Sequence, residues 1–111
     1  MSQILCSVAF SGSSRKMTAS AKRAVEKAVR GPAHELTVIL EAYSEHGPTD
    51  QLPVRLAQSA ARASAVRDFI LSLGYPSHKI KVRNRADRDY ENSTGGRPTA
   101  PSRRVDLIAL F

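Results

Sequence analysis

The chain has 111 residues and a formal net charge of +7, with 41% apolar and 24% charged residues. This length and composition are typical of one folded domain with one hydrophobic core, so we expect a single domain over residues 1–111. No segment is long and apolar enough to cross a bilayer, and residues 1–10 lack the features of a signal peptide. We therefore expect either a cytosolic protein or a domain of a longer exported protein.

The charge and the residue types narrow the possible functions. A basic protein attracts polyanions such as nucleic acid, anionic lipid or an acidic wall polymer. Aromatic residues are only 5% and tryptophan is absent, so the chain has few side chains on which single-stranded bases could stack. Cys6 is the one cysteine, which excludes an internal disulfide and a cysteine metal cluster and favours a buried structural thiol. The histidines show no metal-binding spacing, and we expect no metal and no cofactor.

The first two predicted elements are a strand and a helix. Residues 3–10 alternate between apolar and polar side chains, which predicts a strand. Its apolar face is expected to carry Ile4, Cys6, Val8 and Phe10. Residues 17–31 have the pattern of an amphipathic helix, with Thr18 as N-cap and Gly31 at the end. The expected buried stripe is Ala21, Ala24, Val25, Ala28 and Val29. The expected outward residues, interpreted first as a solvated face and second as a binding patch, are Lys22, Arg23, Glu26, Lys27 and Arg30.

A second strand and a second helix follow. Residues 34–43 alternate with one apolar and one mixed face, as expected when helices cover one side of a sheet. After a loop over residues 44–53, residues 56–75 form an alanine-rich helical pattern. Asp50 is expected to cap this helix and Gly74 to end it. Its expected apolar stripe is Leu56, Ala60, Ala63, Val66, Ile70 and Leu73.

Two strands complete the predicted fold. Residues 79–85 alternate, with Ile80 and Val82 expected to point inward, and residues 103–111 form the last strand. Between them, residues 86–102 form a polar loop whose length is typical of a functional or mobile segment. The order β-α-β-α-β-β predicts the α+β class: a two-layer sandwich of a small mixed sheet with two helices on one face.

Arg62 lies among alanines, about three turns after Asp50, the expected cap of the second predicted helix. Its spacing alone favours an exposed arginine whose stem lies along the helix. The alternative is a binding role, because a guanidinium binds a carboxylate through two parallel hydrogen bonds. Glu45, at the end of the second strand, could then pair with an ammonium, and the two residues would hold a zwitterion. Glu45 could equally be a solvated loop acid or an ion partner of Arg62. No nucleophile or nucleotide-binding motif is present, so we expect no enzyme.

Four segments of the chain, in order, resemble the OmpA-like peptidoglycan-binding domain, a family shared by outer-membrane anchoring proteins and flagellar stators. The segments are VAFSGSSRKMTASAKRAVEKAV (8–29), LEAYSEHG (40–47), QSAARASAVRDFILSLGYPSHKIKV (58–82) and SRRVDLIAL (102–110). The resemblance covers nearly the whole chain. It implies the same β-α-β-α-β-β order and a role in binding the diaminopimelate of the peptidoglycan stem peptide.

The resemblance also implies a set of ligand-binding residues. Arg62 matches the family arginine that binds the carboxylate of the ligand. The family aspartate that binds the ammonium falls on Glu45, with Ser44 at the preceding threonine, and Asp50 could replace Glu45. The arginine of the last motif corresponds to Arg103 or Arg104. The expected ligand-binding residues are therefore Glu45, Asp50, Arg62, Ser44, Arg103 and Arg104.

Three hypotheses of function follow. The first is a non-catalytic peptidoglycan-binding module that works in the periplasm as a domain of a longer envelope protein. We expect no membrane span within this chain. The second is a protein-interaction module with a degenerate site in a secretion or conjugation apparatus, because Glu45 replaces the family aspartate and Ser102 a family asparagine. The third is a nucleic-acid binder, which is ranked last because only the charge supports it.

Overall fold

The structure, a computed structural model, describes residues 2–11, 14–43, 52–86 and 103–111. Its elements are β1 (Ser2–Ala9), α1 (Ala19–Arg30), β2 (Thr37–Tyr43), α2 (Leu52–Ser72), the 3₁₀ turn η2 (Ser77–Lys79), β3 (Ile80–Ala86) and β4 (Arg104–Leu110). This order confirms the predicted β-α-β-α-β-β arrangement.

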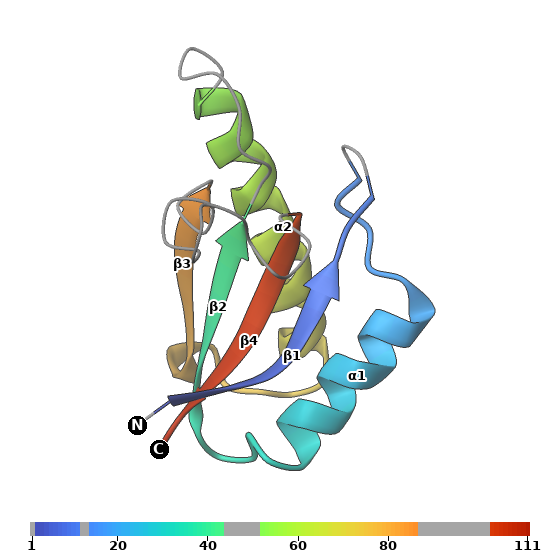
Figure 1. Cartoon of the computed structure of the whole chain (residues 1–111). Helices are drawn as coiled ribbons and strands as arrows, with labels where there is room; N and C mark the ends of the chain where they lie inside the picture. Colours follow the sequence, from blue (N-terminus) through green and yellow to red (C-terminus); the bar gives the residue numbers. More distant parts are fainter. Residues whose placement is uncertain (1, 12–13, 44–51, 87–102) are drawn as a thin grey trace, which may run out of the picture.

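The four strands form one mixed sheet in the order β1-β4-β2-β3. β4 is antiparallel to both of its neighbours, whereas β3 is parallel to β2 and forms one edge. α2 crosses behind β2, β3 and β4, and α1 packs against β1 (Figure 1). The core joins Val25 and Val29 of α1 and Ala63, Val66 and Ile70 of α2 to the inward residues of the strands. Both helices therefore cover one face, which confirms the two-layer α+β fold.

The predicted helix ends have clear physical causes. The hydroxyl of Thr18 accepts a hydrogen bond from the backbone N–H of Ala21 at 3.1 Å, which satisfies one of the N–H groups that the first turn of a helix leaves unpaired. Gly74, two residues after α2, has a φ of +93°, a conformation that side-chain-bearing residues rarely adopt. These two residues place the ends of the helices as the sequence predicted.

β1 differs from its prediction because it contains a β-bulge. Ile4 pairs with Ile108 and Cys6 with Leu107, so Leu5 is an extra residue in the pairing. One extra residue reverses the alternation of side chains between the two faces. Ile4 is therefore 56% exposed, while Leu5 and Cys6 both pack against the core. The expectation that Ile4 shares a face with Cys6 is wrong.

The buried stripe of α2 is polar along the first half of the helix. Leu56 and Ala60, predicted inside, are exposed. The buried residues there are Arg55, Ser59 and Arg62, and the apolar part of the stripe begins at Ala63. Arg62 is only 1% exposed, so the interpretation of an exposed arginine is wrong.

Two smaller errors have a common cause, which is the position of each residue at the side of the sheet. Ala24 is exposed, because α1 packs at the β1 side of the sheet and buries a narrow stripe. Val82 is 47% exposed on the edge strand β3, although Ile80 in the same strand is buried as predicted.

The conformation of Gly74 leads to a stability prediction. Gly74→Ala should lower the free energy of unfolding by about 1–2 kcal/mol, because an L residue is strained at positive φ. No atom lies close enough to the new methyl group to add a clash. Gly74→Asn should lose less, since asparagine tolerates this region better. Urea denaturation measures both, and an alanine variant as stable as the parent protein would contradict this explanation.

Candidate functional site

Arg62 lies at the centre of the candidate site, enclosed between α2 and the residues that follow β1. Its Nε donates a hydrogen bond to the carbonyl oxygen of Ser14 at 3.0 Å. Its guanidinium carbon lies 5.6 Å from the centroid of the Phe10 ring. Phe10 is buried and is held in place by a hydrogen bond from its backbone N–H to the carbonyl oxygen of Arg103 at 2.9 Å. The segment that follows β1 therefore contacts this side chain through both Phe10 and Ser14.

These contacts fix the direction of the Arg62 guanidinium. A charged group removed from water is costly unless hydrogen bonds and charge compensate for the lost hydration. The carbonyl of Ser14 and the negative face of the Phe10 ring supply part of that compensation. Because Nε is bonded to backbone, the plane of the guanidinium is set before any ligand arrives. An arginine held in this way suits recognition of a planar anion such as a carboxylate.

Polar residues that the sequence analysis did not predict as part of the site continue from Arg62 toward the start of α2. Ser59 is fully buried, and its hydroxyl donates to the side-chain oxygen of Asn84 in β3 at 2.5 Å. The amide of Asn84 donates in turn to the carbonyl oxygen of Leu56 at 2.9 Å. These bonds tie the first half of α2 to β3. The spacing of Arg55, Ser59 and Arg62 at i, i+4 and i+7 was the signal that places them on one face.

The predicted acidic half of the site cannot be placed beside Arg62 from the described residues. Ser44, Glu45 and Asp50 lie outside them. All three belong to the connection between Tyr43, the last residue of β2, and Leu52, the first of α2. Their proximity to Arg62 therefore stays an expectation.

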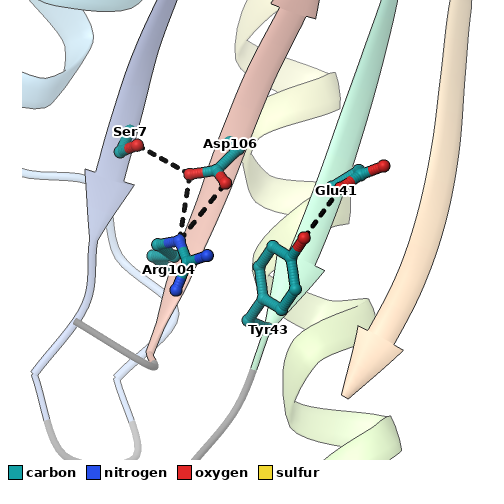
Figure 2. Close-up of polar contacts among 5 residues, drawn as sticks. All are labelled: Ser7, Glu41, Tyr43, Arg104 and Asp106. Atoms are coloured by element: carbon teal, nitrogen blue, oxygen red, sulfur yellow. Dashed lines mark hydrogen bonds and ion pairs between the residues drawn. The ribbon is translucent and has the colours of Figure 1, made fainter. Parts of the chain in front are cut away.

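Arg104 lies on the other face of the sheet, away from the helices (Figure 2). Its Nε bonds to both carboxylate oxygens of Asp106, at 3.1 and 3.2 Å, and its guanidinium carbon lies 4.1 Å from the centroid of the Tyr43 ring. Asp106 also accepts a hydrogen bond from the hydroxyl of Ser7 at 2.6 Å. The structure thus does not bring Arg104 to Arg62. The backbone of Arg103 reaches the edge of the site, because its carbonyl oxygen accepts a hydrogen bond from the N–H of Phe10, whose ring lies under the guanidinium of Arg62.

A second polar group lies beside the first on this face. The hydroxyl of Tyr43 donates to one carboxylate oxygen of Glu41 at 2.7 Å (Figure 2), and Arg83 donates to the other at 2.6 Å. Burial, followed by the hydrogen bond and the charge of Glu41, raises the pKa of Tyr43. The pairing register places Ser7, Asp106, Glu41 and Arg83 in one row across the sheet. These contacts join neighbouring strands and leave the tyrosine protonated at neutral pH.

The described residues offer little for metal binding or nucleophilic chemistry. Among them, no three His, Cys, Asp or Glu side chains are grouped to hold a metal ion. Burial, and then the charge of Asp106, raises the pKa of the Cys6 thiol, so this sulfur is a poor nucleophile at neutral pH. Within the same described part of the chain, neither helix has both the length and the apolarity that crossing a membrane requires.

The Asp106 network leads to a second prediction. Asp106→Ala should lower the free energy of unfolding by about 3 kcal/mol, because it removes the carboxylate from a buried ion pair with Arg104. Ser7→Ala, which removes only the hydroxyl that Asp106 accepts, should cost about 1 kcal/mol. Thermal and urea unfolding measure both values. Equal losses for the two variants would show that the ion pair does not stabilise the sheet.

The sequence matches no protein-family model and no curated protein. The fold is nevertheless similar to several solved structures. The OmpA-like domain of FopA1 from Francisella tularensis has a TM-score of 0.75 at 23% identity, over 92% of this chain and 68% of that one. The peptidoglycan-associated lipoprotein from Burkholderia pseudomallei has a TM-score of 0.75 at 18% identity, over 94% and 89%. The cell wall anchor of the T6SS from Pseudomonas aeruginosa has a TM-score of 0.66 at 22% identity, over 92% and 74%. At these identities the similarity concerns the fold, and the chain has the fold of OmpA-like domains, as its sequence motifs predicted.

Proposed function

We propose that the chain is a non-catalytic peptidoglycan-binding module that anchors an envelope protein or machine to the cell wall. The similar structures support the general role, since one is a peptidoglycan-associated lipoprotein and another a cell wall anchor. In this proposal the module works in the periplasm as one domain of a longer envelope protein. Its net charge of +7 favours encounter with an anionic wall.

The observation that carries the proposal is the buried and oriented guanidinium of Arg62. Diaminopimelate in the stem peptide presents a carboxylate and an ammonium on the same carbon. Arg62 would bind the carboxylate through its planar fork, with little loss of side-chain entropy because Ser14 and Phe10 already hold it.

The ammonium of the ligand requires an acid near Arg62. Glu45 and Asp50 are the two candidates, because both lie in the connection that leads into α2. Ser44 would add a hydroxyl, and Arg103 would support the site through its backbone bond to Phe10. Of the two arginines that match the last family motif, Arg103 suits this role better, since Arg104 is engaged by Asp106 on the other face.

A second candidate function is a protein-interaction module that keeps the scaffold without wall binding. The replacement of the family aspartate by Glu45 and of a family asparagine by Ser102 favours it. The similarity to a T6SS cell wall anchor is compatible with a secretion apparatus in either case. The two candidates differ in their response to a muropeptide.

An NMR titration with a diaminopimelate-containing muropeptide tests the proposal. We expect saturable amide shifts in residues 44–62 of the parent protein. Arg62→Ala should abolish them, and Arg62→Lys, which keeps the charge but lacks the planar fork, should weaken binding about tenfold, or about 1.4 kcal/mol.

Arg67→Ala is the matched control, because Arg67 is a half-buried arginine on the same helix, five residues and more than one turn after Arg62. It should bind as the parent protein does. If Arg62→Ala fails to fold, Arg62→Lys still allows muropeptide binding to be measured on a folded variant. The absence of shifts at millimolar muropeptide would reject wall binding and favour the second candidate.

A further inference from the structure

β1 forms an edge of the sheet that carries no charged side chain. Among the described strands it pairs only with β4, so its outer edge presents backbone N–H and C=O groups to the surroundings. Natural proteins usually protect such edges with charges or proline, because an exposed edge accepts a further strand. β3, the opposite edge, follows that rule with Lys81, Arg83 and Arg85. The sequence of β1, SQILCSVA, does not.

The backbone groups on the outer edge of β1 can be assigned. The N–H of Phe10 donates to the carbonyl oxygen of Arg103, so Phe10 points its backbone groups toward the β4 side. In an antiparallel pair the direction alternates from residue to residue. The N–H and C=O of Ser7 and Ala9 therefore point away from β4.

A hollow of about 420 Å³ lies beside this part of the edge. Ser7 and Ala9 line it from β1, and Ser20, Ala21 and Ala24 line it from α1. The small side chains of α1 leave room where a larger residue would cover the strand. Because an added strand lies about 4.8 Å from the edge it joins, the hollow is where its backbone would run.

The helix that borders the hollow is cationic. α1 carries four cations, Lys22, Arg23, Lys27 and Arg30, against one carboxylate. Arg23 and Lys27 each lie three residues after a lining residue of α1, Ser20 and Ala24, so helical spacing places these two exposed cations next to the lining residues. A segment that enters it meets positive charge along one side.

We propose that the β1 edge and α1 together bind an extended acidic segment of a partner protein by strand addition. The backbone of Ser7 and Ala9 would pair with the segment, and Arg23 and Lys27 would attract its carboxylates. A second copy of this chain is a poorer occupant, because it would bring two cationic α1 helices together. Phe10, over which Arg62 lies, also lines the hollow, but strand addition would use the backbone of Ser7 and Ala9 and does not depend on peptidoglycan binding.

The test uses the ¹⁵N-labelled chain and a blocked ten-residue peptide of alternating glutamate and threonine. We expect its addition to shift the amide signals of Ser7 and Ala9 and to slow their hydrogen exchange about tenfold at saturation. A peptide with lysine in place of glutamate should bind weakly. Ala24→Trp, which fills the hollow from an exposed position, should abolish the protection.

A matched pair of variants tests the role of charge. Lys27→Glu should weaken binding about fivefold, whereas Lys81→Glu, the same charge change at the exposed β3 edge, should not. Protection at β3 instead of β1, no protection at 2 mM peptide, or concentration-dependent dimerisation that protects Ser7 and Ala9 without peptide would each overturn the proposal.

Discussion

The guanidinium of Arg62 is enclosed between α2 and the residues that follow β1, where it bonds to the carbonyl of Ser14 and lies over the ring of Phe10. Removing this charge from water costs several kcal/mol, so the contacts that compensate must be kept in place. The same contacts hold α2 against the end of β1. The polar start of α2 is also hydrogen-bonded to β3, through Ser59 and Asn84. Polar contacts therefore attach α2 to both the end of β1 and the edge strand β3.

Buried arginines lie on both faces of the sheet. On the helix side, Arg62 bonds to the backbone carbonyl of Ser14 and lies over the ring of Phe10. On the other side, Arg104 is matched by Asp106 within β4, and Glu41 of β2 is matched by Arg83 of the neighbouring strand β3. A carboxylate already bonded to an arginine stabilises the fold but leaves that arginine engaged. Because Arg104 is bonded to Asp106 on the face away from the helices, we assign it a structural role.

Periodicity predicted the order of the elements, because the apolar residues of the core follow the two-residue and 3.6-residue repeats of strands and helices. It missed the exposure of Ile4, because the bulge at Leu5 depends on pairing with β4 and not on the sequence of β1 alone. It also predicted that Arg62 is exposed, because periodicity assigns apolar residues to the inward side of a helix. In the first half of α2 the inward side chains are polar. The family resemblance, not the spacing, pointed to a binding role for Arg62. The acid expected to complete the site, Glu45 or Asp50, rests on its position in the sequence and on that resemblance.

The Nε–H resonance of Arg62 tests the account most directly, because it reports on the one side chain that links the fold to the proposed site. If the guanidinium is buried and bonded to Ser14, this proton should exchange with water much more slowly than that of the exposed Arg23. Its signal should persist when muropeptide is added, while the outer amino groups of Arg62 shift. An Nε–H that exchanges as fast as that of Arg23 would contradict the account.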